Sequence, residues 1–208
     1  MVNTIYMMTP QQTAKTYDLI AEHWDNPSFD YRNGIVQHQR ALQFAPAGGD
    51  ALDVGCGSNG RIIALLQNNG FHVEGLDISV EMLNRAQKHH PEVLFYRADI
   101  CEWTLPKTYH FISAWDSVWH VPLADQLSVI KKLCAGLTKN GVLIFTSGGV
   151  DAPDEVTNPC FGQPLYHAAP GIPQLLNTIE VSGCCCRHLE YDGKPGDKHI
   201  YIIAQRIS

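Results

Sequence analysis

The chain has 208 residues, of which 45% are hydrophobic and 17% are charged, and its formal net charge is −6. This composition argues against a disordered chain, and the acidic charge gives no broad attraction to nucleic acid or to an anionic membrane. No apolar run is long enough to cross a bilayer, and the N-terminus lacks an export signal. We therefore expect a cytoplasmic enzyme or binding protein, with residues 1–208 in a single domain.

Seven cysteines are present, and the last three are consecutive at Cys184–Cys186. An odd number outside any metal-binding spacing favours reduced thiols over a disulfide framework. In an extended strand the middle thiol of the triplet points away from the other two, so the three cannot readily meet at one tetrahedral metal. The triplet predicts apolar core packing, and we expect no metal site.

Residues 1–48 are expected to form a helical cap. The first helix is predicted over Thr9–Trp24, because Thr9 can cap it and Pro10 suits its first turn. A second helix is predicted over Tyr31–Phe44, before a segment rich in proline and glycine.

From residue 49 onward, short apolar runs alternate with amphipathic segments. This alternation predicts an α/β fold, in which a mostly parallel sheet is covered by helices on both faces. Its loops at the carboxyl ends of the strands then share one edge, where open sheets bind ligands. The expected strands are Ala51–Val54, His72–Leu76, Val93–Tyr96, Phe111–Ala114 and Val142–Thr146, and the expected helices are Arg61–Asn68, Val80–His89 and Leu123–Leu137.

The C-terminal part predicts a loop, a helix and a hairpin. Residues 147–170 are polar and rich in glycine and proline, so we expect a long irregular loop on the substrate side. Apolar residues at helical spacing follow, and Gly183 ends that helix. The apolar runs Cys184–Tyr191 and His199–Gln205 are separated by a short turn, which predicts an antiparallel hairpin at the end of the sheet.

One stretch, Ala51–Gly60, joins a predicted strand to a predicted helix through a glycine-rich turn. Glycines let the backbone turn sharply and approach a ligand, and the helix start offers unpaired N–H groups. The spacing of Gly55, Gly57 and Gly60 is weak evidence alone, since such turns also occur for purely steric reasons.

Three carboxylates lie at or near the ends of the first three expected strands: Asp53, Asp77 and Asp99. An acid at the end of the second strand can accept hydrogen bonds from a ribose diol, which implies a ligand containing a nucleoside. Asp53 lies two residues before Gly55, where it would repel a phosphate. Asp99 can accept from an adenine amine. The expected ligand is therefore a nucleoside that carries positive groups.

With these residues in place, the chain resembles the class I S-adenosylmethionine-dependent methyltransferases from about Tyr17 to Arg206. The resemblance implies a Rossmann-like three-layer sandwich with a seven-stranded, mostly parallel sheet. The sequence departs from many relatives at Ser58-Asn59-Gly60, where they have an earlier third glycine. Three segments carry the resemblance, in the family's order: Leu52-Asp53-Val54-Gly55-Cys56-Gly57-Ser58, Gly75-Leu76-Asp77-Ile78-Ser79 and Ala98-Asp99-Ile100.

The implied cofactor is S-adenosyl-L-methionine. The loop in the first segment would wrap the methionine part of the cofactor. The second segment would bind its ribose, and the third would bind its adenine. Aromatic faces near the sulfonium would add cation–π attraction. The cofactor-binding residues that this resemblance implies, with the aromatic candidates, are Tyr17, Asp53, Gly55, Cys56, Gly57, Asp77, Ile78, Asp99, Ile100 and Trp115.

Methyl transfer from a sulfonium needs alignment and exclusion of water, and it needs no protein nucleophile. His120, after the fourth strand, could act as a general base, or it could be a loop histidine satisfied by solvent or backbone. His167 is a second catalytic candidate. Asp116, Trp119 and Tyr166 are predicted to bind the substrate.

The predicted function is methyl transfer to a small molecule, by a monomer or homodimer that binds neither nucleic acid nor membranes. The segment after the fourth strand lacks the Asn/Asp-Pro-Pro-aromatic motif of amino-group nucleic-acid methyltransferases. Two alternatives stay open: a methyltransferase that acts on a protein or another macromolecule, and a module that binds the cofactor without catalysis.

Overall fold

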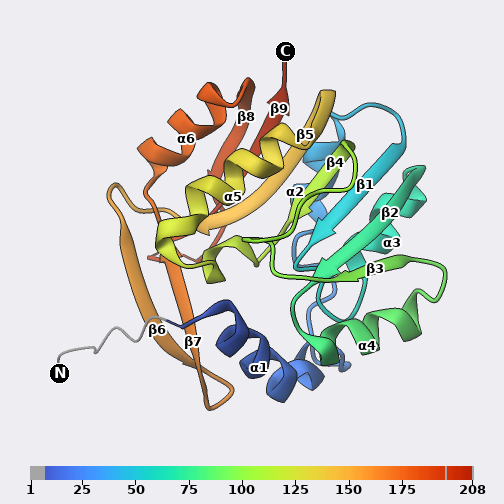
Figure 1. The fold of residues 1–208 in the computed structure, drawn as a ribbon, viewed down its shortest axis with the longest axis vertical. Coiled ribbons are helices and arrows are strands. Elements are labelled where there is room, and N and C mark those ends of the chain that lie inside the picture. Colours follow the sequence, from blue (N-terminus) through green and yellow to red (C-terminus); the bar gives the residue numbers. More distant parts are fainter. Residues whose placement is uncertain (1–7, 195, 208) are drawn as a thin grey trace.

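The computed structural model describes residues 8–194 and 196–207 (Figure 1). A seven-stranded sheet lies at its centre, and a separate two-stranded sheet lies beside it. The helices are α1 (Pro10–Ile20), η1 (Ala21–Trp24), α2 (Ile35–Leu42), α3 (Arg61–Asn68), α4 (Val80–His89), η2 (Val118–His120), α5 (Leu123–Ala135) and α6 (Ile172–Val181). The strands are β1 (Gly49–Val54), β2 (Phe71–Asp77), β3 (Leu94–Arg97), β4 (Tyr109–Ala114), β5 (Leu137–Gly148), β6 (Asp154–Cys160), β7 (Gln163–Ala169), β8 (Cys184–Tyr191) and β9 (His199–Arg206).

The large sheet has the strand order β3-β2-β1-β4-β5-β9-β8. Strands β1 to β5 pair in parallel, and β9 is antiparallel to both of its neighbours. The predicted α/β fold with a terminal antiparallel hairpin is confirmed. Because the chain order reverses between β1 and β4, the loops after these two strands diverge and leave room for a ligand at their carboxyl ends.

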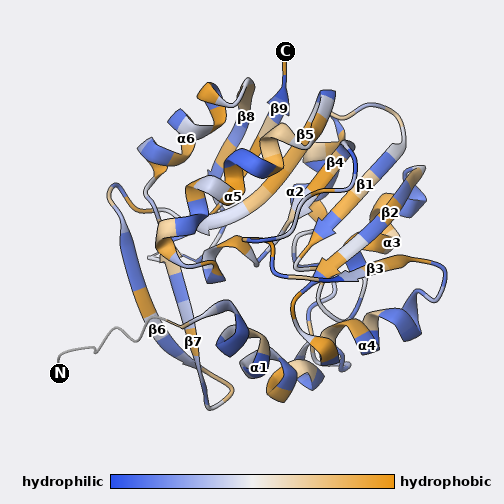
Figure 2. Cartoon of the chain, in the orientation of Figure 1, coloured by the Kyte–Doolittle hydropathy of each residue, from blue (hydrophilic) through white to orange (hydrophobic). Residues whose placement is uncertain are grey.

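Two apolar clusters lie on opposite faces of the sheet. Side chains of α5 and α6 form one cluster with Leu52 of β1, whereas side chains of α2 and α3 form the other with the adjacent Ala51. This follows from the alternation of side chains along a strand that is buried on both faces. Figure 2 shows both apolar and polar residues on the helices that cover the sheet, as expected of helices with one buried face.

The segment predicted as an irregular loop over residues 147–170 is ordered as strands, so that prediction is wrong. Strand β5 continues to Gly148, and β6 and β7 form a hairpin. Its two-residue turn is Phe161-Gly162, whose φ values of +48° and +79° are those of a tight hairpin turn. Prolines at paired positions, Pro159 and Pro164, and many polar residues hid the alternation of this hairpin.

The predicted second helix begins later than expected, at Ile35. Gly34 precedes it with a φ of +84°, and a Cβ there would lie 2.9 Å from the indole of Trp115. A glycine is therefore needed where the chain passes this tryptophan, and the helix starts only beyond it. The first helix agrees with its prediction and carries the capping box of Thr9 and Gln12, although its last four residues, Ala21–Trp24, are a 3-10 turn.

All seven cysteines are free thiols. Cys184 and Cys186 both contact the cluster that α5 and α6 cover, which agrees with the predicted apolar role of the triplet. Across residues 8–194 and 196–207, none of the helices has both the length and the apolar character needed to cross a membrane.

Candidate functional site

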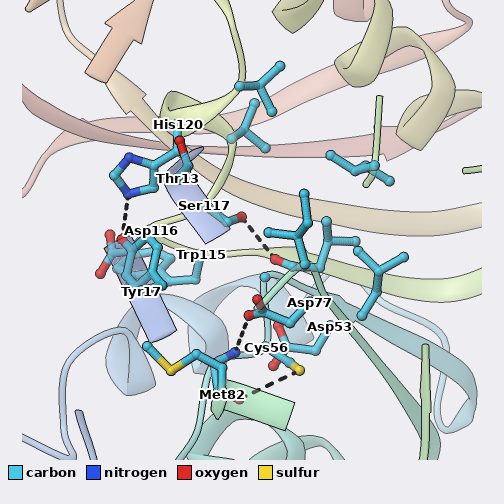
Figure 3. A pocket seen from close by; sticks show the side chains of 18 of the residues that line it. Thr13, Tyr17, Asp53, Cys56, Asp77, Met82, Trp115, Asp116, Ser117 and His120 are labelled. Atoms are coloured by element: carbon cyan, nitrogen blue, oxygen red, sulfur yellow. Dashed lines mark hydrogen bonds between the residues drawn. The ribbon is translucent and has the colours of Figure 1, made fainter. Parts of the chain in front are cut away.

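A pocket opens at the carboxyl ends of β1, β2 and β4 (Figure 3). Its walls are the loop between β1 and α3, the residues that follow β2, β3 and β4, and one face of α1. Pro10, Thr13 and Tyr17 share that face because they are three and four residues apart on the helix. Helix α1 packs against α4 and β7, so the N-terminal segment closes the pocket on the side opposite the sheet.

The glycine-rich loop after β1 has the backbone conformation that its glycines permit. Gly55 and Gly57 have φ values of +70° and +63°. A Cβ on Gly55 would lie 2.3 Å from the Cβ of Ser117, so the chain after β4 packs directly on this glycine. A Cβ on Gly57 would meet no atom of the described residues within 4 Å. The first glycine thus serves packing, and the second leaves space for a ligand.

The third glycine of the loop, Gly60, lies directly before α3 with a φ of +64°. A Cβ there would lie 2.2 Å from the ring of His90. Ser58 and Asn59, between Gly57 and Gly60, line the pocket where many relatives have an earlier glycine.

Asp77, at the end of β2, is tied to the loop by its carboxylate. One oxygen accepts from the N–H of Gly57 at 3.0 Å, and the other accepts from the N–H of Ser79 at 2.9 Å. Burial raises the pKa of Asp77, although these backbone hydrogen bonds act in the opposite direction. Each carboxylate oxygen keeps a lone pair for a further donor.

Asp53 lies within β1 and is only 3% exposed. Burial raises the pKa of its carboxyl to about 6, while a hydrogen bond from Ser113 and the charge of Arg61 lower it. The Ser113 hydroxyl also lies 3.0 Å from Nε2 of His38, whose Nδ1 donates to the carbonyl of Gly34 at 2.7 Å. A buried polar chain therefore connects this acid to α2.

His120, in η2, is held by three hydrogen bonds. Its Nδ1 lies 2.7 Å from the carbonyl of Tyr166 and must donate to it, which leaves Nε2 as the acceptor in the neutral ring. That nitrogen accepts from the hydroxyl of Tyr17 at 2.7 Å and from the indole N–H of Trp119 at 2.9 Å. Burial, together with the charge of His167, lowers the pKa of His120 to about 3. The ring is therefore neutral and fully hydrogen bonded.

Asp116 follows Trp115 at the end of β4 and has a φ of +51°, which is uncommon for a residue with a side chain. Its N–H donates to Oγ1 of Thr146 at 2.8 Å. One carboxylate oxygen accepts from Asn33 at 3.1 Å, and the other accepts from Nε2 of His199 at 3.2 Å. The carboxylate lies at the pocket lining, held by residues far away in sequence.

A profile of the methyltransferase domain family matches residues 31–175. The chain belongs to this family. The match spans most of the chain, including the glycine-rich loop and the ends of β2 and β4, and it confirms the predicted resemblance to class I methyltransferases.

Curated relatives and solved structures agree with this methyltransferase domain. A trans-aconitate 2-methyltransferase from Rhodopseudomonas palustris is 32% identical over 146 residues, covering 66% of this chain and 54% of the relative. A ubiquinone biosynthesis O-methyltransferase from Histophilus somni is 29% identical over 156 residues, covering 67% and 64%. The chain thus spans less than two thirds of each relative's length.

The crystal structure of an S-adenosylmethionine-dependent methyltransferase from Clostridium acetobutylicum has the same fold. It superposes with a TM-score of 0.72 and 14% identity, covering 92% of this chain and 99% of that one. At this identity the similarity shows the fold alone.

The methyltransferase domain brings most of the predicted site residues to one pocket. Trp119, Tyr166 and His167 are not among its lining residues. Tyr166 is fully buried behind it, with its hydroxyl donating to Glu155 at 2.7 Å, and the ring of His167 lies 4.7 Å from that of His120. The predicted residues that do line the pocket are Tyr17, Asp53, Gly55, Cys56, Gly57, Asp77, Ile78, Asp99, Ile100, Trp115, Asp116 and His120.

Thr13, Ser58 and Arg61 are among the lining residues that the sequence analysis did not name as site residues. The hydroxyls of Thr13 and Ser58 are buried without a hydrogen-bond partner among residues 8–194 and 196–207. Arg61 is the one cationic side chain among the described lining residues, and it is anchored by the carbonyl of Asn33 at 2.8 Å. The spacing of Thr13 and Tyr17 on α1 was available as a signal, but nothing local indicated that this face covers the pocket.

A metal centre has no support in the described part of the chain, where no group of three or more histidine, cysteine or acidic side chains is placed to hold an ion.

Proposed function

We propose that this chain is an S-adenosyl-L-methionine-dependent methyltransferase that acts on a small molecule. One observation carries the proposal: the buried hydroxyls of Thr13 and Ser58 line the same pocket as Asp77, and neither has a partner within the described residues. Buried hydroxyls are nearly always hydrogen bonded, so these two support a polar ligand in this space.

The nucleoside part of the cofactor fits the end of the pocket at β2 and β3. Asp77 would accept from the ribose hydroxyls with its remaining lone pairs. Ile78 and Ile100 would pack on the faces of adenine, and Asp99 would accept from the adenine amine. All four residues line the pocket, and the carboxylate of Asp77 is already fixed by two backbone N–H groups.

The methionine part fits the glycine-rich loop. The open side of Gly57 leaves room for it, and Arg61 would pair with its carboxylate because ionic hydrogen bonds to guanidinium are strong. Asp53 would attract its ammonium group. We call these groups, with Asp77 and Asp99, the cofactor end of the site.

The cofactor would supply the methyl group as a sulfonium, and the chain would hold, align and shield it. Tyr17 and Trp115 offer aromatic faces for cation–π attraction. His120 would act as a positioning residue, since its acceptor nitrogen already receives the hydroxyl of Tyr17. We call Tyr17, Asp116, His120 and the residues that hold them the acceptor end.

A small molecule is favoured because α1 covers the pocket, which suits an acceptor that enters it. Two alternative hypotheses remain. The chain could transfer the methyl group to a macromolecule, or it could bind the cofactor without catalysis. We also propose action in the cytoplasm, which the seven free thiols support, as a monomer or homodimer.

Isothermal titration with S-adenosyl-L-methionine tests binding, and folded protein that gives no binding heat would rule the proposal out. Release of S-adenosylhomocysteine in the presence of small-molecule acceptors tests catalysis. Binding without any release would instead favour the non-catalytic module.

A further inference from the structure

The acceptor end of the pocket contains a second polar chain, which runs from the terminal hairpin to Asp116. His199, the first residue of β9, has one ring nitrogen hydrogen bonded to the Asp192 carboxylate and the other 3.2 Å from a carboxylate oxygen of Asp116. Gln37 of α2 donates to the other oxygen of Asp192 at 2.7 Å. Three parts of the chain that are distant in sequence, α2, the end of β4 and the terminal hairpin, are therefore linked to one pocket carboxylate.

The hydrogen bonds fix the charge of this chain. A carboxylate only accepts, so an imidazole between two carboxylates must donate from both nitrogens and is a cation. Burial by itself lowers the pKa of His199, but the hydrogen bonds and charges of Asp116 and Asp192 overcome it and raise that pKa. Two carboxylates and one imidazolium leave a net charge of −1, and the oxygen atoms at the pocket belong to Asp116.

The side-chain donors of Tyr17, Trp115 and Trp119 are each engaged by another side chain. The Tyr17 hydroxyl and the Trp119 indole both donate to His120. The Trp115 indole donates to Oδ1 of Asn33 at 3.2 Å, which turns the amide nitrogen of Asn33 toward Asp116. What these groups leave for a ligand is therefore acceptor capacity, from the carboxylate of Asp116 and the oxygen of Tyr17.

We propose that the methyl acceptor is a primary or secondary amine, bound as an ammonium at Asp116. An ammonium donates hydrogen bonds and carries a positive charge. It therefore matches both the free acceptor oxygens and the negative charge at the acceptor end. A carboxylate acceptor brings neither property, and it would meet Asp116 in a pocket whose one described cation, Arg61, is assigned to the cofactor. An alcohol would lack the charge attraction.

The reaction needs the amine, S-adenosyl-L-methionine as the methyl donor and Asp116 as the proton acceptor. The bound ammonium passes one proton to the Asp116 carboxylate, and the freed nitrogen lone pair forms a bond to the methyl carbon. The carbon–sulfur bond breaks with its electron pair going to sulfur, so the products are a methylated ammonium and S-adenosylhomocysteine. The proton then leaves Asp116 for solvent. Asp116 is the catalytic residue, while His199 and Asp192 are positioning residues.

This inference rests on the proposed function, and its first test separates the two. Purified protein is titrated with S-adenosyl-L-methionine, then supplied with three pools of acceptors that share carbon skeletons and bear an amine, a hydroxyl or a carboxylate. S-adenosylhomocysteine release is expected to be at least about tenfold faster with the amine pool. A tenfold difference in rate corresponds to ~1.4 kcal/mol in activation free energy. Absence of cofactor binding would contradict the proposed function. Normal cofactor binding with preference for another pool, or reaction with none, overturns the amine assignment.

Variants test the roles within the chain. Asp116→Asn is expected to lower the rate with amines about 100-fold, as does loss of a proton-accepting group in general, with cofactor affinity nearly unchanged. His199→Leu should raise the KM for the amine more than it lowers kcat, and His199→Gln, which keeps an N–H donor, should restore part of that loss. Glu180→Gln, an exposed acid on α6, is the matched control and should behave as wild type. Equal losses in both His199 variants, accompanied by weaker cofactor binding, would indicate a purely structural role and overturn the assignment.

Discussion

The cofactor end and the acceptor end are built in different ways. At the cofactor end, Asp53, Gly57 and Asp77 lie within 25 consecutive residues, and backbone N–H groups hold the carboxylate of Asp77. At the acceptor end, Tyr17 and His199 come from opposite ends of the chain, and side chains hold one another. Backbone-held geometry follows from local sequence, whereas side-chain networks depend on the whole fold.

The largest expected effect tests whether the glycine-rich loop is as closely packed as its geometry implies. Gly55→Ala places a Cβ 2.3 Å from Ser117 in a residue with φ of +70°, so we expect a loss of roughly 2–5 kcal/mol in the free energy of unfolding. Urea unfolding measures it. Gly57→Ala is the matched control, with similar φ and open space, and should cost about 1 kcal/mol of stability.

The same control separates packing from binding. Because the Cβ of Gly57→Ala would enter the pocket, we expect this variant to fold but to bind S-adenosyl-L-methionine more weakly. Equal stability losses in the two variants would show that Gly55 is not packed as described.

The second prediction concerns the carboxylate that the loop holds. Asp77→Ala is expected to weaken cofactor binding by about 1.5–3 kcal/mol, because charge-assisted hydrogen bonds to the ribose are lost and the N–H of Gly57 is left without its acceptor. Isothermal titration measures the affinity, and Glu180→Gln controls for loss of an acid elsewhere. An unchanged affinity would remove Asp77 from the binding site.

These two predictions concern residues whose position in the fold, at one edge of the sheet, could be predicted from the sequence. Asp53, the loop glycines, Asp77 and Asp99 were identified because they follow strands whose apolar runs are short and clear, and parallel strands bring their carboxyl ends to one edge. The sheet, its crossover helices and the terminal hairpin were predicted for the same reason. Hydrophobic periodicity is a local property of the sequence, so it can be recognised without knowledge of tertiary contacts.

The side-chain contacts at the acceptor end could not be predicted from the sequence. His120 was a candidate general base, with a loop histidine satisfied by solvent or backbone as the alternative, and its partners, Tyr17 and the carbonyl of Tyr166, lie 103 and 46 residues away. Nothing in the local sequence reveals that its acceptor nitrogen is already engaged. His199 was not among the candidate site residues, because its contacts with Asp116 and Asp192 form only in the folded chain. The hairpin β6–β7 was missed because its prolines and polar residues mask the strand pattern.

The third prediction sets stability against binding at the cofactor end. The folded pKa of Asp53, about 6, lies above its ordinary value, so its charged form destabilises the fold above that pH. Asp53→Asn should therefore raise the free energy of unfolding by about 1–3 kcal/mol above pH 6. The gain should shrink as the pH falls from 6 toward 4, where the wild-type carboxyl becomes protonated.

Urea unfolding at several pH values measures this difference, and titration with S-adenosyl-L-methionine should show weaker binding in the same variant. A stability difference that does not change with pH would mean that burial of the charged Asp53 carboxylate does not destabilise the fold.

The smallest expected effect addresses the side-chain network of the acceptor end. Tyr17→Phe removes the hydroxyl that donates to His120, while Trp119 still satisfies that nitrogen. We expect the rate of methyl transfer to fall about 2- to 10-fold, because the acceptor end loses one hydrogen bond and the hydroxyl oxygen of Tyr17. Cofactor affinity should change less. Tyr31→Phe, at an exposed tyrosine, is the matched control.

A double-variant cycle decides whether Tyr17 and His120 act as one unit. If His120 works only by orienting the tyrosine hydroxyl, Tyr17→Phe combined with His120→Gln should be no slower than the slower single variant, because the shared interaction can be lost only once. Additive losses would mean that His120 contacts the acceptor by another route. Because the pKa of His120 is lowered to about 3, its ring should stay neutral near pH 7. The pH dependence of the rate should therefore contain no step that disappears in His120→Gln.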